Sequence, residues 1–182
     1  MNIALIGMRS TGKSNISRRL SVKTKWPVLS TDLLISYENN GLSIPDIVAN
    51  SKGDWRGFRD MEYAVIAKCA ALDKAIIDCG GGVIVDLDQS GKEIYSSRKM
   101  DALKKNCTII WLKGDIPRLA AKVAKDAGRP SLSEIESAEE IMVRRMPFYE
   151  QAADIVVDIE EKKRSEIATE ILRALEYSMK VG

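Results

Sequence analysis

The segment at residues 7–14 constrains this chain more than any other, because a glycine-rich loop of this kind needs a strand before it and a helix after it. Its sequence, GMRSTGKS, matches the pattern G-x-x-x-x-G-K-[ST] in full. The apolar run at residues 3–6 suits a buried parallel strand, and the pattern at residues 13–20 is helical. We therefore expect an α/β fold that starts with a strand, a phosphate-binding loop and a helix.

The chemistry of phosphate binding explains the spacing within this loop. Glycines let the backbone curl so that N–H groups face phosphate oxygens, and the N-terminus of the next helix adds partial positive charge. Lys13 is expected to reach the β- and γ-phosphates of a nucleoside triphosphate, and the Ser14 hydroxyl to ligate Mg²⁺. A chance match is disfavoured by the strand before the loop. The residues expected to contact the nucleotide are Gly7, Met8, Arg9, Ser10, Thr11, Gly12, Lys13 and Ser14.

Strand-like and helix-like segments alternate along the rest of the chain. Continuous apolar runs predict strands, and apolar spacings of three and four residues predict helices. The predicted strands lie at residues 26–30, 75–78, 108–112 and 155–157, and the predicted helices at about 55–72, 116–125, 134–145 and 165–179. This alternation predicts a three-layer sandwich, in which a parallel sheet of about five strands is flanked by helices, and a single domain over residues 1–182.

Two shorter segments carry local signals. Ser43 precedes Pro45 and Asp46, an order typical of the start of a helix. The stretch at residues 86–97 is polar, so we interpret it as an excursion on the surface.

Composition excludes several classes of function. The 28 basic and 26 acidic residues leave a net charge of +2, so the broad basic field of a nucleic-acid-binding protein is absent. No apolar run reaches membrane-spanning length, and the first residues read as a strand rather than a signal peptide. We expect a cytoplasmic enzyme that acts as a monomer, with no nucleic-acid or membrane partner.

The chain has no histidine, so a catalytic base would have to be a carboxylate or a lysine, if a strong base is needed at all. Its cysteines stand alone within apolar runs and lack metal-ligand spacing, which predicts small buried thiols rather than disulfides. These cysteines are Cys69, Cys79 and Cys107.

Further polar features follow the predicted strands. Each has an ordinary structural interpretation when taken singly, as a helix cap, a solvated charge or a tight turn. They are Asp32, the pair Phe58-Arg59 with Glu62, the triple glycine at Gly80, Gly81 and Gly82, the pair Arg129-Pro130, and the run at residues 145–149 that starts with Arg145.

Taken together, in this order behind the phosphate-binding loop, these features resemble the shikimate kinase family over residues 3–159. The most specific parts are GDWRGFRDME at residues 53–62, similar to the family's G-E-x-x-F-R-x-x-E, the triple glycine, Arg129-Pro130, and R-x-P-x-Y at residues 145–149. The resemblance implies a core like that of nucleoside monophosphate kinases, with a substrate-binding insert at about residues 32–60 and a lid at about 113–133. It also implies phosphorylation of shikimate to shikimate 3-phosphate in aromatic amino-acid (chorismate) biosynthesis, with ATP and Mg²⁺ as cofactors.

The resemblance also assigns roles to particular residues. It implies that Asp32 lies against the hydroxyl to be phosphorylated, that Arg59 and Arg145 hold the substrate carboxylate, and that Arg129 reaches the phosphates from the lid. A planar guanidinium binds a carboxylate bidentately, and a lid arginine excludes water and stabilises charge during transfer. The catalytic residues expected are Lys13, Asp32 and Arg129. The substrate contacts expected are Asp32, Arg59, Gly80, Gly81, Gly82 and Arg145.

The chain departs from the family at several positions. Ser30 stands where the family usually has an acid that supports Mg²⁺, and Lys122 stands where it usually has an arginine that contacts adenine. Asp78, at the end of the strand at residues 75–78, is our candidate to replace that acid, with Ser14 as the other metal residue. The alternative for Asp78 is a turn cap or a pair with a lysine. The segment at residues 86–97 is also longer than usual.

Two other functions stay open at this point. Another P-loop kinase for a hydroxy acid, such as a gluconate kinase, would also suit Asp32 together with two arginines. A nucleotide-binding regulator without catalysis belongs to a different class. The serine at position 30 keeps that class open, whereas the intact Lys13, Ser14, Asp32 and Arg129 argue against it.

Overall fold

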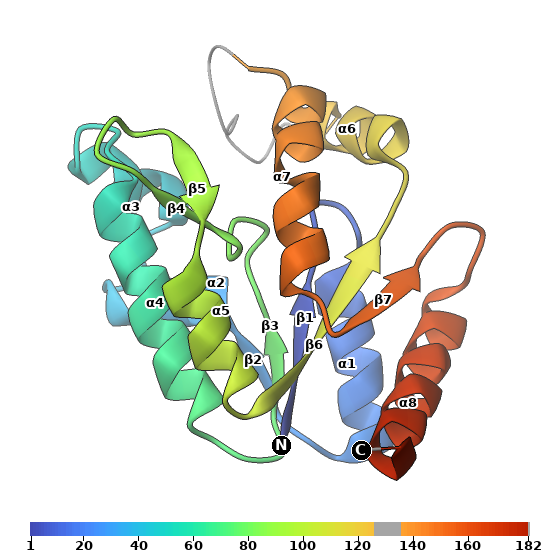
Figure 1. Ribbon diagram of the computed structural model, residues 1–182. Helices are drawn as coiled ribbons and strands as arrows, with labels where there is room; N and C mark the ends of the chain where they lie inside the picture. The colour runs from blue at the N-terminus through green and yellow to red at the C-terminus, as the bar shows by residue number, and fades with distance from the viewer. Residues whose placement is uncertain (126–135, 182) are drawn as a thin grey trace.

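The computed structural model describes residues 1–125 and 136–181, and its centre is a five-stranded parallel sheet with the order β2-β3-β1-β6-β7 (Figure 1). A separate antiparallel hairpin joins β4 to β5. The strands are β1 (Asn2–Ile6), β2 (Val28–Ser30), β3 (Ile76–Asp78), β4 (Val85–Leu87), β5 (Glu93–Tyr95), β6 (Cys107–Lys113) and β7 (Ile155–Asp158). The carboxyl ends of the parallel strands meet at one edge, where ligands bind in open α/β sheets.

Helices cover both faces of the sheet, which makes three layers (Figure 1). On one face α1 and α8 pack against the strands, and on the other face α4, α5 and α7 do so. The helices of the described residues are α1 (Lys13–Thr24), α2 (Thr31–Glu38), α3 (Ile44–Asn50), α4 (Arg56–Ala70), α5 (Ser97–Lys104), α6 (Ile116–Ala124), α7 (Ala138–Ala152) and α8 (Arg164–Val181).

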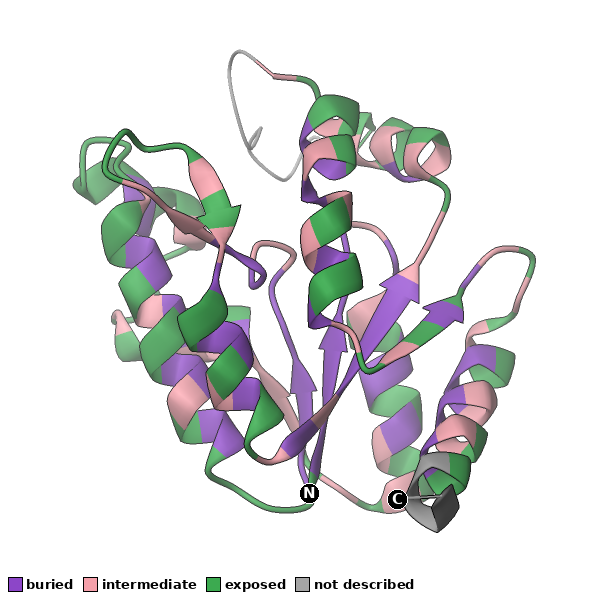
Figure 2. Ribbon diagram, in the orientation of Figure 1, coloured by how far each residue is buried: buried purple, intermediate pink, exposed green. Residues whose placement is uncertain are grey.

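Alternation along β1 explains why the sheet needs helices on both sides. Ile3 and Leu5 belong to the core beneath α1 and α8, whereas Ala4 and Ile6 belong to the core beneath α4 and α5. Successive side chains of a strand point to opposite faces, so a strand that is apolar at every position must be covered twice. Figure 2 shows this burial in the central strands, and β1 is buried over its whole length.

The predicted fold class is confirmed by this architecture. The helix start at Ser43 is also confirmed, because the Ser43 hydroxyl accepts a hydrogen bond from the Asp46 N–H at 3.3 Å. The three cysteines are buried and free, as expected. None of the helices in the described residues is long and apolar enough to cross a bilayer.

The interpretation of residues 86–97 as a surface segment agrees with the structure, in which Ser96 is the one buried residue of the segment. The segment holds most of the β4–β5 hairpin, and the side chains of Asp86 and Glu93 are each only 13% exposed. Both carboxylates lie among arginines from other elements, Arg98 for Asp86 and Arg145 for Glu93. The two carboxylates are largely shielded from water because they find distant partners, which local pattern cannot reveal.

Candidate active site

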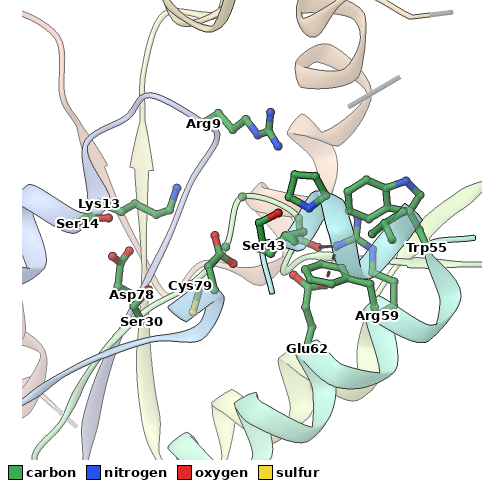
Figure 3. Close-up of a pocket in the computed structure, with 18 of the residues that line it drawn as sticks. Arg9, Lys13, Ser14, Ser30, Ser43, Trp55, Arg59, Glu62, Asp78 and Cys79 are labelled. Atoms are coloured by element: carbon green, nitrogen blue, oxygen red, sulfur yellow. Dashed lines mark hydrogen bonds and ion pairs between the residues drawn. The ribbon is translucent and has the colours of Figure 1, made fainter. Parts of the chain in front are cut away.

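A cavity of about 790 Å³ opens at the carboxyl edge of the sheet. The phosphate-binding loop and the start of α1 line one side of it, and α3 and α4 line the other. Figure 3 shows Lys13, Ser14, Ser30 and Asp78 gathered on the first side, with Arg59 and Glu62 on the second. Residues from the N-terminal, middle and C-terminal thirds of the chain therefore meet in one cavity.

Backbone geometry explains the glycines of the phosphate-binding loop. Gly7 has φ +152°, and a Cβ there would lie 2.9 Å from the Leu112 carbonyl oxygen. Gly12 has φ +87°, and a Cβ there would lie 2.9 Å from Nε of Arg164. An added side chain would be strained at both positions, so the tight path of the loop requires glycine.

The N-terminus of α1 offers its N–H groups to the cavity. Gly12 is its N-cap and provides no side-chain cap, and no acidic residue lies in the first turn. By contrast, α3 and α7 are capped by Ser43 and Ser137. Uncapped N–H groups and the helix dipole make this end a binding site for anions.

Lys13 is held over the loop by backbone oxygens. Its Nζ donates hydrogen bonds to the carbonyls of Gly7 at 2.8 Å and Met8 at 3.1 Å. Thr11, which is buried, donates from Oγ1 to the Met8 carbonyl at 3.0 Å and stabilises the same turn. The loop therefore positions an ammonium group beside the uncapped helix end without using any acidic side chain for these bonds.

Asp78 and Ser30 lie side by side in adjacent strands. The register of β2 and β3 pairs Ser30 with Asp78, and that of β1 and β3 pairs Leu5 with Asp78. Ser30 is the N-cap of α2, where its hydroxyl is 3.5 Å from the Leu33 N–H. Asp78 is 6% exposed and lines the cavity, with no hydrogen bond or ion pair to its carboxylate from any residue the structure describes. The cavity therefore contains a carboxylate where β3 ends, next to position 30.

The triple glycine makes room for two of the predicted substrate residues. A Cβ at Gly80 would lie 2.5 Å from Oδ1 of Asp32, and a Cβ at Gly82 would lie 2.6 Å from Nη1 of Arg59. A side chain at either position would force the Asp32 carboxylate or the Arg59 guanidinium to move. The glycines therefore let Asp32 and Arg59 approach the backbone closely from two different helices.

Arg59 is buried on α4 and held by a carboxylate from the same helix. Its Nη1 donates to Oε2 of Glu62 at 2.6 Å and to the Gly82 carbonyl at 3.3 Å. The guanidinium also lies 5.4 Å from the ring centroid of Trp55 and 5.6 Å from that of Phe58. Its Nε is buried without a hydrogen-bond partner among the described residues. A buried donor without a partner is costly, so this group is suited to a ligand.

A lysine from α5 shares the same carboxylate. Lys99 is completely buried, and its Nζ donates to Oε2 of Glu62 at 3.0 Å and to the Val85 carbonyl at 2.6 Å. Burial, together with the charge of Arg59, lowers the pKa of Lys99, although Glu62 and Asp86 act to raise it. Burial raises the pKa of the Glu62 carboxyl, but the charges of Arg59 and Lys99 outweigh burial and hold this pKa below its usual value of 4.5. One carboxylate thus accepts from two cations, and Lys99 also lies 3.9 Å from the Asp86 carboxylate.

Arg145 on α7 belongs to a second group of this kind. Its Nε donates to Oε2 of Glu93 at 3.0 Å, and its Nη2 donates to Oε1 of the same residue. Nη2 of Arg144 donates to Oε2 of Glu93 at 3.1 Å. Burial raises the pKa of the Glu93 carboxyl, but hydrogen bonds and charge from Arg145 and Arg144 outweigh burial and lower this pKa below 4.5.

Most of the predicted site residues line this one cavity, although several do not. Gly7, Met8 and Thr11 belong to the phosphate-binding loop but do not line the cavity. Lys122 is exposed on the last turn of α6, away from the wall. Arg129 lies outside the described residues. The residues that line the cavity are Arg9, Ser10, Gly12, Lys13, Ser14, Asp32, Arg59, Asp78, Gly80, Gly81, Gly82 and Arg145.

Sequence reasoning did not identify three charged residues that contact this site. Lys99 lies one position before Met100, and both are buried. The neighbouring apolar residue was a weak signal that Lys99 is buried. Glu93 and Arg144 gave no signal, because the partners of Glu93 lie on another element 51 and 52 residues away.

Comparison with known proteins gives a consistent result. The family model described as shikimate kinase matches residues 9–176. A shikimate kinase of Leptospira borgpetersenii is 43% identical over 97% of this chain and 98% of its own length. The shikimate kinase of Acinetobacter baumannii, solved in complex with shikimate, superposes with a TM-score of 0.81 at 23% identity, over 97% of this chain and 93% of that one. The shikimate kinase of Aquifex aeolicus superposes with a TM-score of 0.74 at 27% identity, over the full length of both chains.

Proposed function

This chain belongs to the shikimate kinase family, and on that basis we propose that it transfers the γ-phosphate of ATP to a ring hydroxyl of shikimate, giving shikimate 3-phosphate. The observation that carries the proposal is the content of one cavity. A complete phosphate-binding loop lines one side, and two buried arginines, Arg59 and Arg145, lie with Asp32 on the remaining walls. A nucleotide and a carboxylate-bearing alcohol can be bound there together.

Recognition of the acceptor rests on two guanidinium groups that keep positive charge despite burial. Arg59 and Lys99 share Glu62, and Arg145 and Arg144 share Glu93. Lys99 also lies 3.9 Å from the Asp86 carboxylate, and Arg144 also pairs with Glu136, so the second cation of each group has a carboxylate partner of its own. A buried arginine in such surroundings binds an anionic carboxylate through charge-assisted hydrogen bonds. This favours an acceptor with one carboxylate.

Phosphoryl transfer then needs positioning and charge neutralisation. The acceptor oxygen forms a bond to the γ-phosphorus, the bond from that phosphorus to the bridging oxygen breaks, and ADP leaves. We assign Asp32 to the acceptor hydroxyl, whose proton its carboxylate accepts, and Lys13 to the β- and γ-phosphates. The uncapped N-terminus of α1 adds N–H groups that stabilise negative charge on phosphate oxygens.

Magnesium would be held at the end of β3. The oxygen donors there are the Ser14 hydroxyl and the Asp78 carboxylate, and both line the cavity. Mg²⁺ prefers oxygen ligands and keeps several waters, so a carboxylate close to the phosphates fits as a direct or water-mediated partner. When bound, the ion neutralises charge on the phosphates. We propose that Asp78 supplies the acid that position 30 lacks.

Two further assignments extend this proposal. We assign the substrate-binding insert to residues 32–60, which include α2 and α3, and the lid to residues 113–133, part of which lies outside the described residues. Arg129 would contact phosphates from the lid. Lys122 would contact the nucleotide after a movement of α6, because its side chain is exposed and away from the cavity wall.

A coupled assay of ADP release tests the function directly. We expect ADP release with shikimate, dependent on ATP and Mg²⁺, and little release with gluconate or nucleoside monophosphates. ADP release with gluconate but not with shikimate would identify another hydroxy-acid kinase. Nucleotide binding without ADP release from any acceptor would identify a regulator without catalysis.

A further inference from the structure

The β4–β5 hairpin lies between the two arginines of the acceptor side and contacts the groups that hold both. The Val85 carbonyl on β4 accepts from Lys99, which in turn donates to the carboxylate that holds Arg59. Glu93 on β5 accepts from Arg145. The hairpin thus contributes one contact to each arginine cluster.

The pairing geometry leaves one edge of the Arg145 guanidinium for another anion. Glu93 accepts from Nε and Nη2, which together form the side edge of the group. A guanidinium has five N–H donors. Its end edge, formed by Nη1 and Nη2, can donate two hydrogen bonds to a second carboxylate. Glu93 and an acceptor carboxylate can therefore bind the same arginine at different edges.

The two cavities of the site show on which side Glu93 lies. A second cavity of about 320 Å³ adjoins the first, and Trp55, Arg59 and Arg145 line both. Glu93 lines only the second cavity. It therefore contacts Arg145 from behind the wall and does not occupy the space where an acceptor would bind.

Burial makes this contact a strong constraint on the arginine. The side chain of Arg145 is 7% exposed and that of Glu93 is 13% exposed, so water competes little for the two hydrogen bonds. Long arginine side chains have many rotamers, and a bidentate partner selects one of them. Arg144 holds the same carboxylate at 3.1 Å and limits its movement in turn.

We propose that Glu93 is a positioning residue for acceptor binding: it holds the side edge of Arg145 from behind the cavity wall, so that the end edge faces the carboxylate of the acceptor. This inference rests on the proposed function, because it takes a carboxylate-bearing acceptor as given. Charge alone would have the opposite effect, since a carboxylate near the site repels an anionic acceptor. The sign of the effect of a Glu93 variant therefore distinguishes positioning from competition.

Steady-state kinetics of Glu93→Gln test the proposal. We expect the KM for shikimate to rise about tenfold, while kcat and the KM for ATP stay within about twofold, because only acceptor binding depends on Arg145. Glu139→Gln removes a charge from an exposed site on α7, the helix that carries Arg145, and should leave all three constants unchanged. A lower or unchanged KM for shikimate in Glu93→Gln overturns the proposal.

A double-mutant cycle shows whether Glu93 acts through Arg145. In an Arg145→Ala background we expect Glu93→Gln to change the KM for shikimate by less than about twofold, because the group it positions is gone. An unchanged tenfold effect in that background contradicts the mechanism. If Glu93→Gln does not fold, Glu93→Asp keeps the charge on a shorter side chain and should raise the KM about threefold at constant kcat. An unchanged KM there overturns the proposal.

Wild-type turnover separates this proposal from the proposed function. If the wild-type enzyme uses a different carboxylate-bearing acceptor, the shikimate assignment fails, and the same variants are measured with that acceptor. The proposal for Glu93 is then tested by the same criterion: the KM for that acceptor should rise in Glu93→Gln while kcat stays constant.

Discussion

The two sides of the cavity are built by different means. The phosphate side is formed mainly by the consecutive residues of the loop and the start of α1, with Ser30 and Asp78 beside them, and the bonds of Lys13 to the loop span only five and six positions. The acceptor side is assembled from α4, α5, α7 and the β4–β5 hairpin. Its ion pairs join residues as far apart as 52 positions, as between Glu93 and Arg145.

This difference has a physical cause. A nucleotide phosphate carries several charged oxygens, and N–H groups at a helix end can satisfy them without any buried acid. A single carboxylate on a small acceptor needs guanidinium groups in a sheltered site, and buried guanidinium groups need counter-charges. The phosphate side can therefore be local in sequence, whereas the acceptor side requires a network.

The largest expected effect comes from the phosphate side. Lys13→Ala should lower kcat by about 10³-fold, because it removes a charge that stabilises the transferring phosphoryl group. Affinity for shikimate should stay near normal, since Lys13 contacts the loop and not the arginine clusters. Single-turnover kinetics and calorimetry with shikimate measure both. Lys23→Ala, at an exposed position in the last turn of the same helix, is the matched control. A near-normal rate in Lys13→Ala would remove this residue from the mechanism.

The contrast in locality also sets what the sequence could predict. The phosphate-binding loop and the five strands of the sheet follow from short patterns, and the structure agrees with them. Asp32, Arg59 and Arg145 were assigned through a family resemblance, and all three line the cavity. Their roles stay predictions, because position alone does not establish chemistry.

Residues whose position depends on distant partners escaped the sequence analysis. Lys99 is completely buried because Glu62, 37 positions away, accepts its hydrogen bond. Glu93 belonged to a stretch that read as exposed, and arginines on α7 bury it. Hydrophobic patterning treats a charge as a surface marker, so it fails where a network compensates burial. The eight-residue helices α2 and α5 were also not predicted, since each shows only about two turns of pattern.

The second largest effect is expected at Asp32, which lines the cavity and to which we assign the acceptor hydroxyl. Asp32→Asn should lower kcat about 10²-fold with little change in ATP affinity, because an amide keeps the shape but cannot accept the hydroxyl proton. Rates under saturating substrates and calorimetry with a nonhydrolysable ATP analogue measure this. Asp101→Asn, at an exposed position on α5, is the control. A rate loss below about tenfold would mean that Asp32 orients the hydroxyl without taking its proton.

Substitutions on the acceptor side should weaken shikimate binding and leave nucleotide binding nearly unchanged, whereas Lys13→Ala should lower kcat and leave shikimate affinity near normal. Arg59→Ala and Arg145→Ala should each weaken shikimate binding by about tenfold to a hundredfold, because each removes a charge-assisted hydrogen bond. Nucleotide affinity should be nearly unchanged. Calorimetry with each ligand measures the two affinities, and Arg56→Ala, a half-exposed arginine on the same helix as Arg59, is the control. Lost ATP affinity with normal shikimate affinity would contradict the division of the cavity.

A smaller effect is expected for metal support on the phosphate side. Asp78→Asn should raise the Mg²⁺ concentration for half-maximal rate by about tenfold, because a carboxylate beside the metal is lost. Ser30→Asp in the same protein should partly restore the wild-type value, since the strand register places position 30 next to position 78. Magnesium titrations of ADP release measure both variants. An unchanged Mg²⁺ dependence in Asp78→Asn would rule out the compensation.

The smallest expected effect is on the stability of the acceptor side, and this effect depends on pH. Glu93 has a pKa below its usual value of 4.5 in the folded protein, because Arg145 and Arg144 outweigh the effect of burial. A depressed folded-state pKa contributes stability above the unfolded-state pKa, and that contribution is lost as the pH falls through the folded-state pKa. At pH 7 we therefore expect Glu93→Gln to lower the free energy of unfolding by about 1.5 kcal/mol.

The pH dependence of that difference tests its cause. The wild-type protein and Glu93→Gln should converge in stability as the pH falls below 4.5, because a protonated glutamate and a glutamine are both neutral. Lys23→Ala should show no such convergence, since it removes an exposed lysine from the last turn of α1. Urea denaturation from pH 7 to pH 3 measures the three proteins. A constant gap between wild type and Glu93→Gln over this range would mean that packing, rather than the charge of Glu93, stabilises the acceptor side.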